Sequence, residues 1–159
     1  MEFKYDDGGR QEAGYKGYAS DCVVRAIAIA SGISYQTVYD KLFDLNKANT
    51  KKGRTCSPRD GGTSKKIMYS YLKELGFIWT PLMGIGTGCK YHMKKNELPS
   101  GTIIVNLSKH LSVVKDGVIY DNHDCSRNET RCVYGYWRKQ IKTCTPMGHY
   151  TSSTIYSQY

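Results

Sequence analysis

The feature that most constrains the fold is an apolar segment in the first fifth of the chain. Residues 20–32 read SDCVVRAIAIASG, and after the opening aspartate Arg25 is the only charged residue. Serine and aspartate are favoured at helix N-termini, and a glycine such as Gly32 is favoured just past a helix C-terminus. A helix that is apolar on nearly all sides must be covered by other elements. We therefore predict a buried central helix that starts near Cys22.

The rest of the first half predicts two further helices and little else that is regular. Apolar side chains recur at helical spacing in residues 34–45 and again in residues 64–76. Residues 47–63, between these helices, form a predicted polar loop. Residues 1–17 contain four glycines and many charges, so we predict an irregular lead-in there.

The second half is richer in β-branched residues, which favour strands. Strands are predicted over residues 77–80, 102–107, 110–114, 118–121 and 131–137. Asp116-Gly117 is the strongest short signal for a two-residue hairpin turn. Helices followed by antiparallel strands indicate an α+β fold. We expect one domain over residues 1–159, with a polar tail from residue 142 to residue 159.

Cys22 is the first candidate functional residue, because it lies at the predicted start of the buried helix. Unpaired N–H groups and the helix dipole stabilise a thiolate at this position. The backbone N–H of Cys22 could also donate to an oxyanion. The neighbouring Asp21 does not favour the thiolate, so we interpret it as a cap or as a group that orients a neighbour. The alternative is that Cys22 is simply a small buried side chain.

His110 is the candidate base, because a nucleophilic thiol needs a base and the base needs an orienting group. A turn centred on Asp116-Gly117 would place His110 and Asp121 on one face of the hairpin, as diagonal neighbours within side-chain reach. If the turn gains one residue, Asn122 replaces Asp121 as the orienting group. His123 lies near the same end of the hairpin and could be a second imidazole at the site. Alternatively, His110 is an ordinary strand histidine.

This order of residues resembles the papain-like superfamily of thiol enzymes. In that group a cysteine opens a buried helix, and a histidine and an aspartate or asparagine follow on adjacent strands. Papain-type peptidases, bacteriocin-processing peptidases and NlpC amidases belong to it. More narrowly, residues 21–32, 109–111, 116–121 and 131–137 resemble those of small uncharacterised bacterial and bacteriophage proteins. That closer resemblance covers residues 5–138 and implies no established activity.

The superfamily resemblance implies a papain-like fold, with Cys22 as nucleophile, His110 as general base and acid, and Asp121 as its orienting group. Papain-type enzymes carry a glutamine about six residues before the nucleophile, as an oxyanion donor. Lys16 occupies that place here. The remaining candidate donors upstream of the cysteine, together with Asp21 as a supporting residue, are Gln11, Tyr18 and Ser20.

The expected function is that of a cysteine hydrolase (peptidase or amidase) or acyltransferase acting on an amide, isopeptide or thioester. Its substrate would be a protein or peptide-like molecule, and a phage-encoded protein would act on a host component. The alternative is an inactive papain-like protein that sequesters a host partner or an acidic ligand. A third hypothesis is nucleic-acid binding, since the net charge is +9. This charge is spread along the chain, so nucleic acid is the less favoured partner.

The cysteine spacing predicts neither a metal site nor a cofactor. None of the six cysteines forms a CxxC pair, which is the usual sign of structural zinc. Residues 1–17 lack the apolar stretch of an export signal, so we expect a protein of the cytoplasm, or of the host cytoplasm if phage-encoded. Free thiols are then the expected state of the cysteines. No apolar run reaches the length of a membrane span.

Overall fold

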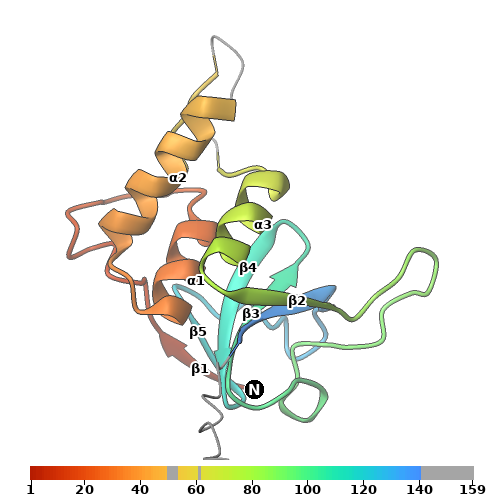
Figure 1. Ribbon diagram of the computed structural model, residues 1–159. Coiled ribbons are helices and arrows are strands. Elements are labelled where there is room, and N and C mark those ends of the chain that lie inside the picture. The colour runs from red at the N-terminus through yellow and green to blue at the C-terminus, as the bar shows by residue number, and fades with distance from the viewer. Residues whose placement is uncertain (50–53, 61, 141–159) are drawn as a thin grey trace, which may run out of the picture.

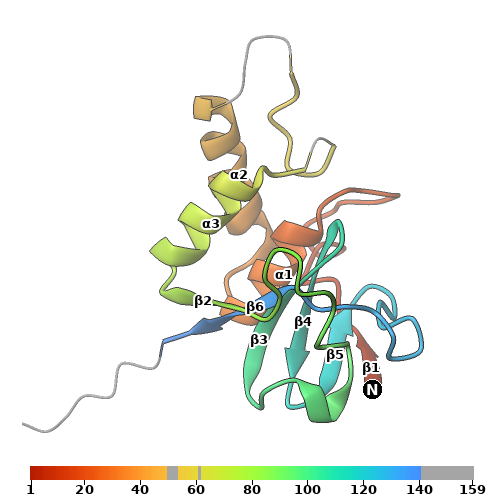
Figure 2. The same ribbon diagram turned by 90° about the vertical axis from the view of Figure 1, so that its right-hand side faces the viewer.

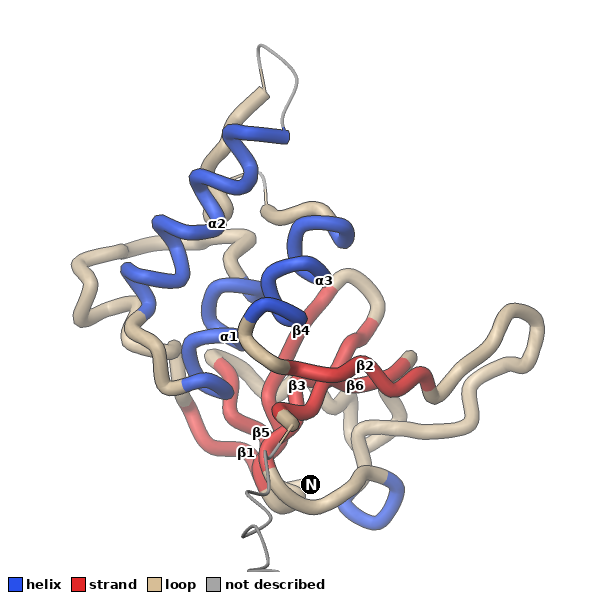
Figure 3. Tube along the Cα trace, in the orientation of Figure 1, coloured by secondary structure: helices blue, strands red, loops and turns tan. Residues whose placement is uncertain are grey.

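The structure is a computed structural model that describes residues 1–49, 54–60 and 62–140. This part of the chain contains three α-helices, a short 3-10 helix and one six-stranded sheet (Figures 1 and 3). The helices are α1 (Cys22–Ser31), α2 (Tyr35–Asn49), α3 (Lys65–Glu74) and the 3-10 helix η1 (Lys95–Glu97). The strands are β1 (Glu2–Tyr5), β2 (Phe77–Pro81), β3 (Thr102–Leu107), β4 (His110–Lys115), β5 (Val118–Asp121) and β6 (Gly135–Lys139).

The predicted central helix is confirmed as α1. It starts at Cys22 and ends at Gly32, which has a left-handed φ of 75°. Residues 23–28 are all buried, because α1 packs against β4 on one side and against α2 on the other (Figure 2). The other two predicted helices are also confirmed, although α2 extends to Asn49.

The sheet has the strand order β1-β5-β4-β3-β6-β2 and is buried on both faces near its middle. Successive side chains of a strand point to opposite faces. Ile104 accordingly packs with the helices, whereas Ile103 and Val105 pack in a second cluster with Met93 and Val133 from the loops. Because β3 and β4 are buried on both faces, their register in the sheet is strongly specified. The site described below lies where β3 ends and β4 begins.

The hairpin between β4 and β5 has the predicted register. Asp116 and Gly117 have φ values of 49° and 80°, and Lys115 pairs with Val118. These left-handed values suit a two-residue turn, in which glycine is favoured because it has no Cβ. Because the turn fixes the register, it also fixes which side chains meet at the far end of the hairpin.

Two predictions about the strands are wrong. Residues 1–17 were expected to be irregular, but β1 forms there and pairs in parallel with β5, which makes the sheet mixed. All four β1 residues are exposed, so backbone pairing rather than an apolar pattern places this edge strand. The predicted strand 131–137 instead begins at Gly135, and Cys132 forms an isolated bridge with His92.

The expectation of free thiols is also wrong for one pair. Cys89 and Cys132 form a disulfide across a sequence separation of 43 residues. The pairing depends on a contact between two distant loops, which the local sequence does not reveal. Cys22, Cys56 and Cys125 are free thiols. The predicted tail from residue 142, and residues 50–53 and 61 of the predicted polar loop, lie outside the described residues. No helix of the described segments is long and apolar enough to cross a bilayer.

Candidate active site

A cavity of about 640 Å³ opens where the N-terminus of α1 meets the ends of β3 and β4. Cys22 and His110 both line it. Cys22 is the first residue of α1, and His110 is the first residue of β4. The packing of α1 on β4 therefore brings together two residues that are 88 positions apart (110 − 22) in the sequence. The cavity offers a substrate direct access to the candidate thiol.

Asp121 holds the imidazole of His110. His110 Nε2 lies 2.7 Å from Asp121 Oδ2, and Asp121 is only 3% exposed. His110 also acts on Cys22, because the imidazole lowers the pKa of the thiol. Because Nε2 is taken by the carboxylate, Nδ1 is the ring nitrogen left for the thiol. Cys22 and His110 thus share one cavity wall, and Asp121 holds His110 in place.

The electrostatics of the site favour a thiolate facing an imidazolium. Burial alone would raise the pKa of Cys22, but hydrogen bonds from His110 and from the Leu111 backbone lower it overall. Burial would lower the pKa of His110, but its hydrogen bonds to Asp121, Cys125 and Cys22 raise it to about 11. A hydrogen bond from His110 also lowers the pKa of Asp121, against the effect of burial. Each charged form is stabilised by its neighbour.

Arg25 connects Asp121 to α1. Its Nη1 donates to Asp121 Oδ1 at 3.0 Å, and its Nε donates to Asp21 Oδ1 at 3.0 Å. All three side chains are buried, so the guanidinium compensates two carboxylates that would otherwise be costly. Arg25 was noted in the sequence only as the charged exception on an apolar helix. A lone arginine on a buried helix needs buried counter-charges, and that was the signal that could have found it.

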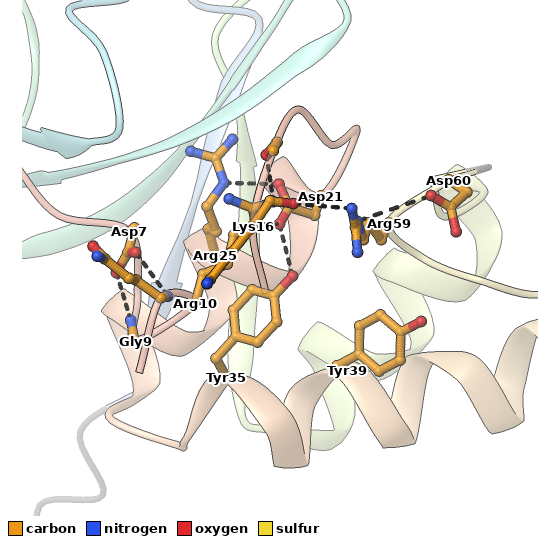
Figure 4. A network of polar contacts seen from close by, with 12 residues as sticks. Asp7, Gly9, Arg10, Lys16, Asp21, Arg25, Tyr35, Tyr39, Arg59 and Asp60 are labelled. Atoms are coloured by element: carbon orange, nitrogen blue, oxygen red, sulfur yellow. Dashed lines mark hydrogen bonds and ion pairs between the residues drawn. The ribbon is translucent and has the colours of Figure 1, made fainter. Parts of the chain in front are cut away.

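Asp21 occupies the N-cap position of α1, but its side chain contacts neighbouring side chains and does not cap the helix. Its side chain makes no capping hydrogen bond to α1. Its two carboxylate oxygens are engaged by Arg25, by Arg10 Nε at 2.9 Å and by the Tyr35 hydroxyl at 2.7 Å. Figure 4 shows Tyr35 and Arg25 converging on this carboxylate from α2 and α1. Of the two interpretations left open for Asp21, the geometry matches the second.

Two of the three candidate oxyanion donors line the cavity. Tyr18 and Ser20 line it, whereas Gln11 does not, and the Gln11 backbone N–H donates to Asp7. Asn106 also lines the cavity and was not singled out in the sequence. It pairs with Leu111 on β4, so its amide lies on the strand beside the candidate base. No sequence signal distinguishes it from an ordinary strand residue.

The two alternative orienting residues occupy supporting positions. The backbone N–H of Asn122 donates to Asp121 Oδ1 at 2.7 Å, and its side-chain oxygen lies 2.7 Å from His123 Nδ1. Asp121, and not Asn122, therefore contacts His110. The rings of His110 and His123 lie 5.1 Å apart at the cavity wall. Burial and the positive charge of His110 lower the pKa of His123, so this second imidazole favours its neutral form.

Cys125 is a further residue beside His110, a neighbour that the sequence did not reveal. It is 2% exposed, and its sulfur lies within 4.8 Å of a ring nitrogen of His110 and a carboxylate oxygen of Asp121. These three types of side chain could hold a metal ion. However, His110 Nε2 and both oxygens of Asp121 already take part in hydrogen bonds. The observed arrangement is therefore that of a hydrogen-bonded base, supported by a buried thiol.

Comparison with protein-family models, with curated proteins and with solved structures finds no match for this chain. The resemblance to papain-like enzymes therefore remains an expectation from the motifs.

Proposed function

We propose that this protein is a papain-like thiol hydrolase or acyltransferase that acts on an amide, isopeptide or thioester. The observation that carries the proposal is that Cys22 and His110 line one cavity, with His110 held by Asp121 at 2.7 Å and lowering the pKa of the Cys22 thiol. A nucleophile, a base and an orienting carboxylate in this order are the components of covalent acyl transfer. The α+β architecture with Cys22 at the start of a central helix supports the papain-like interpretation.

In the first step the Cys22 thiolate attacks the substrate carbonyl carbon. A C–S bond forms, and the carbonyl π electrons move to oxygen to give a tetrahedral oxyanion. When the intermediate collapses, the bond to the leaving nitrogen or sulfur breaks, and the His110 imidazolium gives that atom its proton. The product of this step is an acyl-thioester on Cys22 and a free amine or thiol.

In the second step His110, now neutral, takes a proton from water or from an acceptor amine. The activated acceptor attacks the thioester, and the C–S bond breaks to restore the Cys22 thiolate. Asp121 holds the ring by Nε2 throughout, so Nδ1 stays directed at the reacting atoms. Arg25 is a positioning residue in this scheme, because it fixes the other oxygen of Asp121.

The oxyanion would be stabilised by the backbone N–H of Cys22 and by one side chain of the cavity wall. The first-turn N–H groups of α1 have no partners within the helix, so they are suited to this role. Asn106, Ser20 and Tyr18 are the side-chain candidates that line the cavity. Substituting Asn106 by Ala tests the first of them, since losing one oxyanion donor costs about 100- to 1000-fold in rate.

Alkylation kinetics test the nucleophile independently of any substrate. We expect iodoacetamide to modify Cys22 faster than a free cysteine peptide, with the advantage growing as the pH falls below the ordinary thiol pKa of about 8.5. The sign follows from the lowered pKa of Cys22, because its thiolate persists at a pH where an ordinary thiol is protonated. His110→Ala should remove the advantage. Cys56→Ser is the matched control, since Cys56 is a free thiol outside the cavity lining.

Activity is then tested on a panel of fluorogenic amides, isopeptides and thioesters. We expect turnover that is lost in Cys22→Ala, with an acyl group found on Cys22 by mass spectrometry when the reaction is quenched. Modification of Cys22 no faster than a cysteine peptide would overturn the proposal. A fast Cys22 that never becomes acylated would favour the sequestering protein over the enzyme.

A further inference from the structure

A second group of cysteine, histidine and carboxylate side chains lies away from the cavity. Cys89 and His92 come from the loop after β2, and Cys132 comes from the segment before β6. None of these three residues lines the cavity of Cys22. The disulfide joins Cys89 to Cys132, and His92 Nε2 lies 3.5 Å from Cys89 Sγ. The proposed reaction at Cys22 uses none of them.

We propose that Cys89, His92 and Cys132 form a Zn²⁺ site when the disulfide between the two cysteines is reduced. Zinc in proteins is held tetrahedrally by thiolates and imidazoles. With Zn–S of about 2.3 Å and Zn–N of about 2.0 Å, a tetrahedron separates a sulfur and a nitrogen ligand by about 3.5 Å. The pair Cys89 Sγ and His92 Nε2 already has this separation. A water molecule would complete the coordination.

The histidine has the orientation that metal-binding histidines have. Its Nδ1 lies 3.0 Å from Glu97 Oε2, and the same carboxylate oxygen accepts the His92 backbone N–H at 2.7 Å. A carboxylate on one ring nitrogen fixes the tautomer and turns the other nitrogen, with its lone pair, toward a metal. Glu97 thus holds His92 by Nδ1 and leaves Nε2 to bind the metal.

The backbone holds the two ligand segments together. His92 and Cys132 are partners in an isolated antiparallel bridge. On either side of this pair, Met93 N–H donates to Arg131 O and Val133 N–H donates to Tyr91 O, each at 2.8 Å. A site whose ligands are held by paired backbone needs little rearrangement to bind a metal. The two sulfurs have to separate, and Cys89 is exposed while Cys132 is half-buried, so their side chains have room to rotate.

The change from disulfide to zinc site balances as two steps. In the first, a reductant supplies two electrons, the S–S bond breaks and two thiols form. Thiol reductants also supply the two protons and become a disulfide, whereas a phosphine becomes its oxide and water supplies the two protons and the oxygen. In the second, Zn²⁺ binds two thiolates and the neutral imidazole, and the two thiol protons are released. Oxidation and metal binding therefore exclude each other at this site, because both use the same sulfur electron pairs.

The test uses the full chain, reduced with a phosphine and titrated with Zn²⁺ against a chromogenic chelator. We expect one equivalent of tightly bound zinc in the reduced protein, and none at this site in the oxidised protein. Cobalt in place of zinc should give the thiolate charge-transfer and visible bands of a tetrahedral site. Bound zinc should protect Cys89 and Cys132 from alkylation, as mapped by mass spectrometry. Less than one equivalent in the reduced chain would overturn the proposal.

Substitutions of the proposed ligands test where the zinc binds. Glu97→Gln, which changes the group that holds His92, should weaken zinc binding by roughly 10- to 100-fold. Cys89→Ser and His92→Ala each remove a ligand and should weaken binding by more than that. Cys89 is exposed, so its substitution by Ser leaves the packing intact. Cys56→Ser is the control and should bind as the parent does. If Cys89→Ser retains zinc and Cys125→Ser loses it, the metal lies at His110, and the proposal is wrong.

Discussion

Two regions of this molecule carry a cysteine, a histidine and a carboxylate in contact, and they are built differently. Cys22, His110 and Asp121 come from α1, β4 and β5, and long-range packing brings them together. Cys89, His92 and Glu97 lie within nine residues of one loop region (97 − 89 + 1). In the first group Asp121 is buried and Cys22 and His110 are half-buried at a cavity, whereas the second group lies near the surface with its cysteine in a disulfide. A cysteine, a histidine and a carboxylate in contact therefore do not by themselves make the cysteine a nucleophile.

The surroundings of the carboxylate make the difference. Asp121 is 3% exposed and is shared between His110 and Arg25, so its orientation is fixed by buried charges. The side chain of Glu97 is 31% exposed and contacts His92 only through its ring and backbone N–H. Low dielectric strengthens the first set of interactions, while water screens the second. The first region can hold a charged thiolate–imidazolium pair, and the second suits a metal that brings its own charge.

The largest effect is expected when Arg25 is replaced by Met. The variant leaves Asp21 and Asp121 without their shared cation in a buried setting, so the free energy of unfolding should fall by about 3–5 kcal/mol. Urea unfolding measures the change. The matched control is Lys41→Met, which removes an exposed ion pair with Glu74 and should leave the midpoint unchanged. If both variants behave alike, the buried charges of the first region contribute no more to stability than an exposed ion pair does.

The next largest effect is expected from opening the disulfide of the second region. Reducing the protein in the absence of zinc should lower the free energy of unfolding by about 2–4 kcal/mol, because a cross-link restricts the unfolded chain. The pair closes a long loop, with 43 residues of separation. Cys22 reactivity should be unaffected, since neither sulfur lines the cavity. A large loss of Cys22 reactivity on reduction would show that the two regions are coupled.

The part of the fold that follows local rules could be predicted from the sequence. Gly32 ends α1, and the Asp116-Gly117 turn sets the register that brings His110 to Asp121. Those signals act within a few residues, so periodicity and turn chemistry reveal them. The strand β1 has no such signal, because its exposed residues pair with β5 more than a hundred positions later. Its place depends on backbone pairing with a distant edge, which local patterns do not encode.

The candidate site also combines residues that local sequence patterns predict with residues that only the folded structure reveals. Cys22 and His110 could be predicted because each lies at the end of a predictable element. The place of Cys125 beside His110 could not, since it depends on which side chains meet after folding. Arg25 was marked only as a lone charge on a buried helix, and the sequence did not reveal its partner Asp121. The disulfide partner of Cys89 was hidden for the same reason. Local chemistry indicated Cys22 and His110 as candidates, and tertiary packing supplied the side chains that surround them.

A smaller effect, on the alkylation rate of Cys22, is expected when the carboxylate of the first region is replaced by its amide. Asp121→Asn removes the negative charge that stabilises the His110 imidazolium, so the Cys22 thiolate loses part of its partner. We expect the alkylation rate of Cys22 at pH 6 to fall by about tenfold, equivalent to about 1.4 kcal/mol. Glu97→Gln is the matched change in the second region and should leave that rate unaltered. A Cys22 rate that does not respond to Asp121→Asn would remove the carboxylate from the proposed triad.

The smallest effect is expected at the outer support of the buried site. Tyr35→Phe deletes the hydroxyl that donates to Asp21 at 2.7 Å but keeps the ring, which packs between Tyr15 and Tyr39. Asp21 retains its bonds to Arg25 and Arg10, so the free energy of unfolding should fall by only about 1 kcal/mol.

The matched control is Tyr39→Phe, which removes a 3.1 Å contact between two neutral hydroxyls and should cost less than the loss of a bond to a carboxylate. Urea unfolding of both variants gives the difference. If Tyr35→Phe also slows alkylation of Cys22, Asp21 transmits its orientation through Arg25 to the reacting pair. If the two variants are equally stable, the charge on Asp21 is satisfied by its arginines alone, and the buried site tolerates the loss of its outermost hydrogen bond.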